Sequence, residues 1–283
     1  MKNKKSKIKI CKVFFAIIIL ISFSSDKIHA QYKPSSELGL ALGTSYYNGD
    51  ISSAPFQNIS ASGGITYRRN IDRRFTLKSS AIYASIYADD ENSNDPVLVN
   101  RNLHFKSDIT ELSGQIEFNF LPYETGNSLY PWSPYVFVGV SLFNFNPKAE
   151  ASDGQWYELQ PLSTEGQGTT SRPYLKKYSL TQISMPFGGG FKFAINKNFN
   201  IILEHGIRKT FTDYLDDVST TYPGQPYPTE FNNLQIELSD RSLDGQPKQA
   251  GEARGNSKTD DWYSFSSITL SFQINQKSKG CDY

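Results

Sequence analysis

The chain has 283 residues, with 29 basic and 28 acidic side chains and a formal charge of +1 at neutral pH. That balance argues against a nucleic-acid-binding protein, which would carry a marked excess of basic residues. Aromatic residues make up 14% of the sequence, including 17 Tyr and 19 Phe. Because no segment after residue 30 is long and apolar enough for a transmembrane helix, insertion into a membrane would require strands.

The first thirty residues have the pattern of a secretion signal peptide. Residues 1–12 contain six lysines and no acidic residue, and an apolar run of eleven residues from Val13 to Phe23 follows. Such a run is too short for a helix that spans about 30 Å, but it suits the core of a signal peptide cleaved after Ala30. An uncleaved N-terminal anchor is the alternative. Cleavage would remove seven Lys and one Asp, which leaves 22 basic and 27 acidic residues and a charge of −5.

Eight segments after residue 30 alternate apolar and polar residues with a period of two, the pattern of strands with two unlike faces. The clearest is the last, where Ile268, Leu270 and Phe272 share one face and polar residues occupy the other from Ser267 onward. The predicted strands are Glu37–Tyr47, Ile59–Arg68, Phe75–Tyr87, Leu103–Leu121, Tyr135–Phe145, Ser179–Ile195, Phe199–Phe211 and Trp262–Ile274.

Two of these segments contain residues that do not fit an uninterrupted strand. Ile109 has the parity of the polar residues in its segment, so we expect a bulge near Thr110. Pro186 cannot donate a hydrogen bond to a neighbouring strand, so we expect a bulge or a late strand start there. The run from Gly188 to Gly190 lacks the Lys-Ser/Thr of a phosphate-binding loop and instead suggests close packing of the strand.

The connections between the predicted strands alternate between long and short, as in membrane barrels. The sequence therefore predicts an all-β fold, an eight-stranded antiparallel transmembrane β-barrel of small OmpA/OmpX-like size in the outer membrane. We expect a signal peptide at 1–30, the barrel at 31–274 and a periplasmic C-terminal tail at 275–283, with periplasmic termini and long loops outward. A soluble β-sandwich is the alternative fold. Residues 223–254, rich in Pro, Gly and Gln, are expected to bury little and to be dispensable for folding.

An eight-stranded barrel has an interior just wide enough for side chains to fill. Unpaired charges inside it would be costly, so we expect Glu117 and Glu204 to pair with basic residues. We interpret the inward charges as a structural polar plug, and we do not expect a diffusion pore. The five charged residues with inward parity are Lys78, Glu117, Lys192, Glu204 and Arg208.

Acyl hydrolysis on a barrel would need a serine within hydrogen-bond reach of a histidine on the same face. After cleavage the chain has two histidines, and His104 lies three residues from Ser107, on the opposite face of a strand. His205 has the parity of the lipid face beside Leu203, and the adjacent carboxylate, Glu204, is on the other face. We therefore predict no catalytic residue and no cofactor.

The acidic loops and the remaining cysteine do not form a recognisable metal site. Residues 89–95 are rich in Asp and Asn and could hold calcium, but they lack the glycine and terminal Glu of an EF-hand loop. Asp213, Asp216 and Asp217 form a second acidic group, and both groups are expected to be solvated loop residues. Two separated histidines and one mature cysteine cannot form a metal cluster.

Several segments, in order along the mature chain, are similar to one family of membrane proteins. Among these segments, TFTDYLDDVSTTY (210–222) is the most specific, because strand or loop chemistry alone would not dictate it. The chain thus resembles the PorG-type outer-membrane β-barrel proteins of the Bacteroidota type IX secretion system. The other segments are ELGLALGTSYYNGD (37–50), RNLHFKSDITELSGQIEFNFLPY (101–123), SPYVFVGVSLFNFNPKA (133–149), LQPLSTEGQG (159–168), KYSLTQISMPFGGGFKF (177–193) and DDWYSFSSITLSF (260–272).

The resemblance implies a non-enzymatic component of this protein secretion machinery, associated with its periplasmic ring, in a system that in some species also supports gliding motility. It offers no catalytic residues to carry over. Two other functions stay open for a barrel of this size. One is an outer-membrane enzyme that acts on lipid or peptide, and the other is a stand-alone adhesion or stress barrel.

Cys281 is the one cysteine left after cleavage. An unpaired cysteine in an oxidising compartment suggests an intermolecular disulfide or a reactive free thiol. Given the resemblance, Cys281 is a candidate for a disulfide to a periplasmic ring subunit of the type IX secretion system. A neutral surface thiol is the alternative. The expected partners are therefore ring subunits and outer-membrane lipid, and no nucleic acid.

Overall fold

The computed structural model describes residues 32–52 and 54–274. The predicted signal peptide (1–30), the predicted C-terminal tail (275–283) and Cys281 lie outside the described residues. Within the described part of the chain, no helix combines the length and the apolar character needed to cross a membrane.

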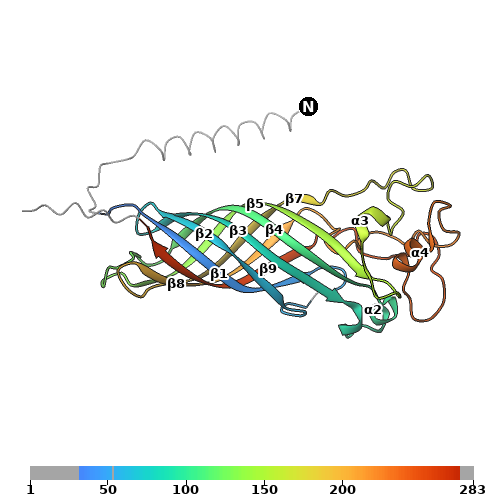
Figure 1. Cartoon of the computed structure of the whole chain (residues 1–283), viewed down its shortest axis with the longest axis horizontal. Coiled ribbons are helices and arrows are strands. Elements are labelled where there is room, and N and C mark those ends of the chain that lie inside the picture. Colours follow the sequence, from blue (N-terminus) through green and yellow to red (C-terminus); the bar gives the residue numbers. More distant parts are fainter. Residues whose placement is uncertain (1–31, 53, 275–283) are drawn as a thin grey trace, which may run out of the picture. The chain divides into compact units, whose positions relative to one another are not determined.

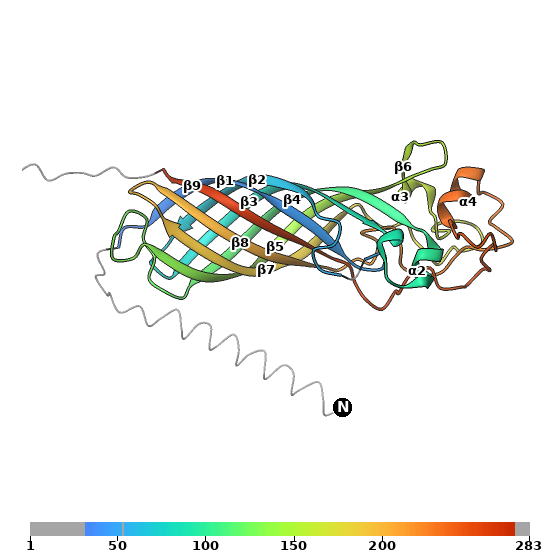
Figure 2. The same cartoon turned by 90° about the horizontal axis from the view of Figure 1, so that it is seen from below.

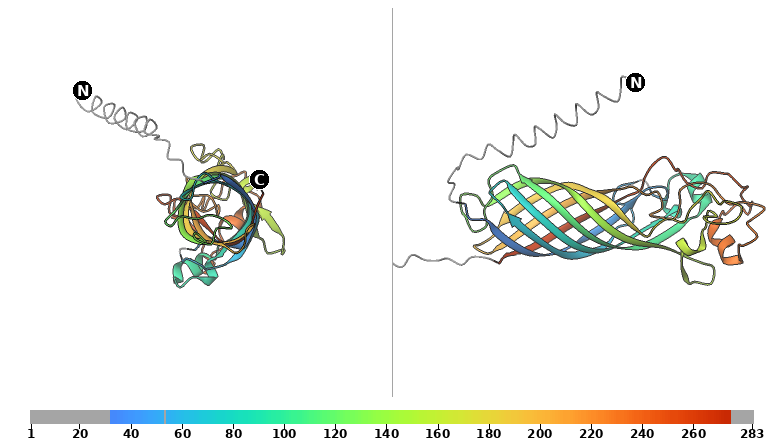
Figure 3. Two further views of the ribbon diagram at one scale, coloured as in Figure 1. Left: turned by 90° about the vertical axis from the view of Figure 1, so that its left-hand side faces the viewer. Right: turned by 90° about the horizontal axis from the view of Figure 1, so that it is seen from above.

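The strands form a closed antiparallel β-barrel of eight long strands (Figures 1 and 2). They are β1 (Ser35–Asn48), β2 (Ser60–Asn70), β3 (Phe75–Asp89), β4 (His104–Asn119), β5 (Trp132–Glu150), β7 (Thr181–Ala194), β8 (Phe199–Thr210) and β9 (Trp262–Gln273). Each pairs with the barrel strand before and after it in sequence, and β1 pairs with β9 to complete the ring seen end-on in Figure 3. The short β6 (Trp156–Glu158) extends the sheet beside β5. The eight predicted strands are confirmed, and the closed ring excludes a β-sandwich.

The two faces of the barrel wall have opposite chemistry. Leu42, Leu112 and Ile268 point outward and are 58%, 59% and 53% exposed. Glu117 and Arg208 point inward and are fully buried. A water-soluble protein would bury the apolar side chains and expose the charges. An apolar exterior around a polar interior is the arrangement of a transmembrane barrel.

The two ends of the barrel differ in the length of their connections (Figure 1). The end with the short connections is here called the turn end. There, aromatic rings from neighbouring strands meet on the exterior. The ring centroids of Phe75 and Phe118 are 5.3 Å apart, and those of Phe199 and Phe272 are 5.0 Å apart. Such aromatic belts mark a membrane interface. The opposite end, which has the long connections, is here called the loop end.

The predicted bulge near Thr110 is wrong. Strand β4 pairs with β3 and β5 in an unbroken register through Ile109 and Thr110. Ile109 points inward and is fully buried with Phe105 and Phe143 in an apolar core that fills the loop-end half of the barrel. The prediction failed because it assumed a polar inner face along the whole strand, whereas apolar side chains join the polar ones inside the loop-end half.

The predicted bulge or late strand start at Pro186 is also wrong. Strand β7 starts at Thr181, and its pairing with β5 keeps one register on both sides of Pro186. Between the pairs Phe187–Val138 and Ser184–Ser141 the ladder with β5 is interrupted, whereas Pro186 still pairs with β8. The missing N–H of proline therefore removes local hydrogen bonding on one side of the strand without inserting a residue.

The loops at the loop end pack into an ordered assembly, here called the loop cap (residues 49–52, 54–59, 90–103, 151–180 and 211–261). Its helical elements are η1 (Asp90–Asn92), α2 (Pro96–Arg101), α3 (Leu159–Leu162) and α4 (Asn233–Ser239). A capping box of Asn232 and Gln235 starts α4, and Leu238, Ser239 and Arg254 are buried. Most of residues 223–254 are exposed or half-buried, as expected, but these few side chains pack into the cap. Average composition hid the few residues that pack into the cap.

Candidate functional site

The turn-end half of the barrel interior contains a cluster of buried charges, here called the central charge cluster. Lys78 Nζ lies 2.6 Å from Glu204, and Lys192 Nζ lies 2.6 Å from Glu117. The guanidinium of Arg68 links the two carboxylates, with Nε 3.1 Å from Glu117 and an NH2 atom 3.5 Å from Glu204. Buried carboxylates and bases are tolerated when each charge has a partner of opposite sign. The cluster thus connects strands β2, β3, β4, β7 and β8 across the lumen.

Neighbouring side chains complete the packing around the central charge cluster. The Tyr135 hydroxyl donates to Glu204 at 2.6 Å, and the Lys192 ammonium lies 4.8 Å from the centre of the Tyr135 ring. Gly190 faces this ring, and a Cβ built on Gly190 would come within 2.0 Å of the Leu203 carbonyl oxygen. Only a residue without a side chain fits there, which agrees with the packing expected for the glycine run.

Arg208 belongs to a second, separate ion pair nearer the loop end. Its Nε lies 3.3 Å from Glu111, which also accepts a hydrogen bond of 2.8 Å from Tyr263. The guanidinium stacks over the ring of Phe265 at 4.2 Å. The structure therefore brings Lys78, Glu117, Lys192 and Glu204 together but places Arg208 with a different carboxylate.

Sequence analysis missed two members of these pairs, Arg68 and Glu111. Both have a signal that could have identified them. Arg68 shares the inward parity of Thr66 on β2, and Glu111 shares that of Glu117 on β4. Applying the parity rule to every charged residue of every predicted strand would have found both.

The turn end of the barrel is closed by the connection between β4 and β5. Tyr123 and Thr125 from this connection are buried. Thr125 Oγ1 donates to Glu37 at 2.9 Å and accepts from Asn200 at 3.0 Å. Glu37 also accepts a hydrogen bond of 2.7 Å from Asn70. The connection is thus tied to β1 and β8, two strands that it does not join, and it reaches across the opening of the barrel.

The loop end is closed by the loop cap, which carries its own buried ion pair. Arg254 lies 3.4 Å from Glu165, and both are buried. Glu165 also accepts hydrogen bonds from the backbone N–H groups of Ser219 and Thr220 at 2.9 and 3.0 Å. These contacts join the loop between β5 and β7 to the loop between β8 and β9.

The acidic group at residues 213–217 was expected to be solvated, and this expectation is wrong for two of its members. Asp216 and Asp217 are buried. Tyr47 donates to Asp216, and Tyr178 donates to Asp217 at 2.6 Å. Burial raises the pKa of Asp217 to about 6, because removing the carboxylate from water disfavours its charged form. Tyr47 of β1 thus ties the cap to the barrel, and Tyr178 joins two loops within the cap.

Little free space remains inside the barrel. An interior void beside Glu204, Arg208 and Phe265 has a volume of about 10 Å³. That is at most the room needed for one water molecule. The charge pairs cross the lumen in its turn-end half, and protein segments cover the barrel at both ends. We therefore assign the interior side chains a structural role.

The histidines differ in what surrounds them. His104 accepts a hydrogen bond of 3.0 Å from the backbone N–H of Glu150, and Ser107 accepts one from Asn146, so the structure does not bring His104 and Ser107 together. His205 lies on the exterior, as its parity predicted, and its Nδ1 is 2.8 Å from Ser266 Oγ. Sequence analysis did not find this His–Ser pair, which is formed by two adjacent strands.

The pair does not have the remaining parts of an acyl hydrolase. A hydrolase needs a group that orients the histidine and free backbone donors for an oxyanion. In the part of the chain that the structure describes, the His205 ring is hydrogen-bonded to Ser266 and to no orienting carboxylate. The strand that carries Ser266 pairs without interruption with β1 and β8 around this position, so its N–H groups are engaged.

The acidic segment at residues 89–95 uses its carboxylates within the protein. Asp89 accepts from the N–H of Glu91, and Asp95 accepts from the N–H of Val97 at the start of α2. Asp90 is paired with Arg101 at 2.7 Å. In the described part of the chain, no group of three or more His, Cys, Asp or Glu residues is arranged to hold a metal ion.

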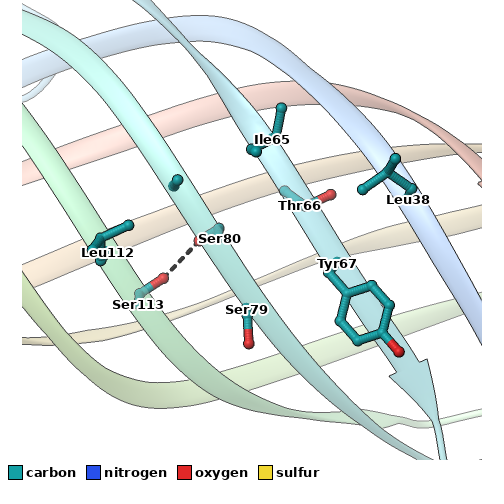
Figure 4. Close-up of a pocket in the computed structure, with 9 residues that line it drawn as sticks. Leu38, Ile65, Thr66, Tyr67, Ser79, Ser80, Leu112 and Ser113 are labelled. Atoms are coloured by element: carbon teal, nitrogen blue, oxygen red, sulfur yellow. Dashed lines mark hydrogen bonds between the residues drawn. The ribbon is translucent and has the colours of Figure 1, made fainter.

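The exterior of the barrel has shallow hollows where small residues interrupt the large apolar ones. One, of about 410 Å³, lies where Ser79 and Ala81 of β3 separate Ile65 and Tyr67 from Leu112 (Figure 4). Behind it, Ser80 and Ser113 form a hydrogen bond of 2.6 Å on the inner face. This hollow has no titratable residue other than a tyrosine, so it offers lipid contact without chemistry.

Comparison with known proteins places the chain as follows. A family model described as Domain of unknown function (DUF6089) matches residues 11–161, more than half of the chain. No curated protein matches the sequence. The chain is similar to the solved structure of Ail, the attachment invasion locus protein of Yersinia pestis, with 11% identity, a TM-score of 0.40, and coverage of 86% of this chain and 99% of that one. It is also similar to Neisserial surface protein A (9%, 0.43, 86% and 100%) and to the N-terminal β-barrel domain of Pseudomonas aeruginosa OprF (11%, 0.36, 86% and 100%).

Proposed function

The chain belongs to the family described as Domain of unknown function (DUF6089), and from that premise we propose that it is a sealed outer-membrane barrel that serves the type IX protein secretion machinery as a non-enzymatic component. The apolar exterior and the pattern of a signal peptide support an outer-membrane location. In this proposal the turn end and both termini face the periplasm, and the loop cap faces outward.

The sealed interior is the observation that carries the proposal. A barrel whose lumen is crossed by the pairs Lys78–Glu204 and Lys192–Glu117 cannot work as a channel for proteins or solutes. Its possible functions therefore depend on its surfaces. A barrel that anchors a periplasmic assembly in the membrane needs only such surfaces and no channel. The sequence resemblance to PorG-type proteins supports the choice of the type IX secretion ring as that assembly.

Cys281 is the proposed covalent contact with the ring. It lies outside the described residues, seven positions after Ile274, in the tail that the proposal places in the periplasm. Non-reducing electrophoresis of membranes should show a heavier band that disappears with dithiothreitol and in Cys281→Ser. An unchanged band pattern and unchanged secretion in Cys281→Ser would refute the tether.

The secretion role is tested by deleting the gene and measuring export of proteins that carry C-terminal sorting domains. We expect export to stop and to return with the wild-type gene. Affinity purification of the tagged barrel from detergent-solubilised membranes should also recover large periplasmic subunits. Normal export in the deletion strain, together with purification of the barrel alone, would contradict the proposal.

The ordered loop cap favours a second candidate function, surface adhesion. Loops that are held by Arg254–Glu165 and by the buried end of helix α4 (Leu238 and Ser239) present a fixed surface rather than a variable coil. A cap variant that abolishes surface binding but leaves secretion intact would favour adhesion over the secretion role.

A further inference from the structure

A row of polar residues interrupts the apolar exterior of the barrel on strands β1, β9 and β8. Thr44 pairs with Ser266, and Ser266 pairs with His205, so the three outward side chains lie side by side. The next row toward the turn end consists of Leu42, Ile268 and Leu203. Polar side chains are costly on a lipid-facing surface unless they have partners.

The partner of His205 within the protein satisfies only one of its ring nitrogens. Nδ1 is hydrogen-bonded to Ser266 Oγ at 2.8 Å. Rings of Tyr46 and Phe56 lie toward the loop end of the histidine, with centroids 6.3 and 5.7 Å from it. Whichever nitrogen carries the proton, Nε2 has no hydrogen-bond partner among the described residues, and the imidazole is half-buried.

A groove of about 550 Å³ runs along the wall at this position. Gly189, which pairs with His205, contributes no side chain and so leaves the groove open. The remaining lining is apolar toward the turn end and polar around the histidine. It includes Leu42, Phe191, Leu203 and Ile268 on the apolar side, and Thr44, His205 and Ser266 on the polar side.

We propose that this groove binds an ester-linked acyl lipid of the bilayer, with one acyl chain along the apolar lining and an ester oxygen hydrogen-bonded to His205 Nε2. Three features support a lipid rather than another ligand. The groove opens on the membrane-facing wall, one side of it is apolar, and its unsatisfied polar atom is placed at the boundary between the two linings. An ester oxygen can only accept a hydrogen bond, so the proposal uses the tautomer in which Nε2 carries the proton and the Ser266 hydroxyl donates to Nδ1. The inference rests on the proposed membrane location.

The test compares diacyl with dialkyl-ether phosphatidylcholine, two lipids that differ in their ester carbonyl groups. Wild type, His205→Phe and Gly189→Leu are reconstituted in each lipid, transferred to detergent, and examined by native mass spectrometry for retained lipid. His205→Phe keeps a ring without the nitrogens. Gly189→Leu fills the groove and requires a small shift of the Tyr135 carbonyl oxygen, which a Cβ at 189 would meet at 2.8 Å. Heat-modifiable migration on gels reports membrane insertion of each variant independently. Released fatty acid is measured in the same samples.

We expect wild type to retain the diacyl lipid about fivefold more than the ether lipid, the effect of one hydrogen bond. This preference should disappear in His205→Phe, and retention of both lipids should fall in Gly189→Leu. Equal retention of the two lipids by inserted wild-type protein would overturn the inference alone. Failure of wild type to insert would overturn the membrane location as well. Fatty-acid release by wild type that is lost in His205→Phe would show an enzyme site and would overturn simple binding. A retained second copy of the chain in place of lipid would also overturn it.

Discussion

Lys78 and Glu204 come from strands β3 and β8, 126 positions apart in sequence, yet the lysine Nζ lies 2.6 Å from both carboxylate oxygens of the glutamate. Both side chains are buried in the middle of the lumen. The contact spans the inside of the ring rather than the sheet, because β3 and β8 are not neighbours. It therefore holds opposite walls together and blocks the passage between them.

Glu204→Gln should strongly destabilise the barrel. The substitution removes the carboxylate partner of Lys78 and one of the two carboxylates that contact Arg68. Breaking a buried ion pair on one side costs about 3–5 kcal/mol. The free energy of unfolding in lipid vesicles, measured with guanidinium chloride, should fall by about that amount.

The double variant Lys78→Met/Glu204→Gln restores the original net charge of the cluster and should lose less of this free energy. Lys197→Met, at an exposed turn, should change the value by less than about 0.5 kcal/mol. A double variant no more stable than Glu204→Gln would speak against a charge-balanced cluster.

The apolar exterior should reject charge in the middle of the barrel wall. Leu40 is 50% exposed on β1, between the aromatic belt and the polar row at Thr44. Leu40→Arg should cost about 2–4 kcal/mol of stability in bilayers, because the guanidinium would face lipid. Leu243, 63% exposed in the loop cap, provides the matched control for the same substitution. Similar losses at the two positions, measured by unfolding in vesicles, would show that the exterior is not in contact with lipid.

The loop cap should depend on its buried ion pair and not on its surface pairs. Arg254→Ala leaves Glu165 buried without its cation and should destabilise the cap by about 3–5 kcal/mol. The exposed pair Lys248–Asp244, at 3.7 Å, is worth about 0–1 kcal/mol, so Lys248→Ala should have little effect. Limited proteolysis of the loops in intact vesicles measures both. The barrel should stay inserted in each variant, since its hydrogen-bonded ladder is unchanged. Equal cleavage of the two variants would contradict the role assigned to Arg254.

Replacing residues 223–254 with a short Gly-Ser linker should make the cap sensitive to protease. The replacement removes Leu238, Ser239 and Arg254, which are buried among the other loops. Insertion, read from heat-modifiable migration, should be retained because the strands outside this segment are untouched. A cap that resists protease as well as wild type after this replacement would show that the segment is dispensable after all.

The cap should loosen as pH rises. The pKa of Asp217 is raised from 3.8 to about 6, and burial is the main cause. A raised carboxyl pKa means that the closed cap binds the proton more tightly than the open one. The stability linked to that proton is complete below about pH 4 and is lost as pH rises through 6.

The equilibrium constant for opening of the loops, measured by hydrogen exchange, should increase about tenfold between pH 5 and pH 8. Asp217→Asn should remove this tenfold part of the profile, and Asp244→Asn, on the cap surface, should not. The dependence that remains in Asp217→Asn belongs to Asp213, whose pKa burial raises to about 7. A profile that is unchanged in Asp217→Asn would assign the pH dependence elsewhere.

The strands and the direction of their side chains could be predicted from the sequence because alternation records a wall between two unlike environments. The parity of Leu112 and Glu117, for example, follows from neighbours in the same strand. Ile109 broke the rule because apolar side chains join the polar ones inside the loop-end half of the barrel. A single strand cannot show where along the barrel that change occurs, since the residues that cover Ile109 come from β5 and from the loops.

The contacts within the candidate sites were harder to predict, because they depend on which strands face each other across the ring. The inward charges were found by parity, but their pairing required the register of non-neighbouring strands, and Arg208 pairs with Glu111 rather than with the other charges. The pair His205–Ser266 joins residues 61 positions apart through the pairing of β8 with β9. The loop cap was predicted least well, since Leu238 and Arg254 are isolated packing residues in a polar segment.

The most direct test of a sealed barrel is the electrical conductance of the purified, refolded protein in a planar lipid bilayer. The ion pairs of the central charge cluster and the closures at both ends predict no current above the bare bilayer, at any voltage the membrane withstands. A porin added afterwards to the same membrane confirms that single channels would be detected. Reproducible current steps from the wild-type protein, at a size expected for an open barrel, would contradict the account.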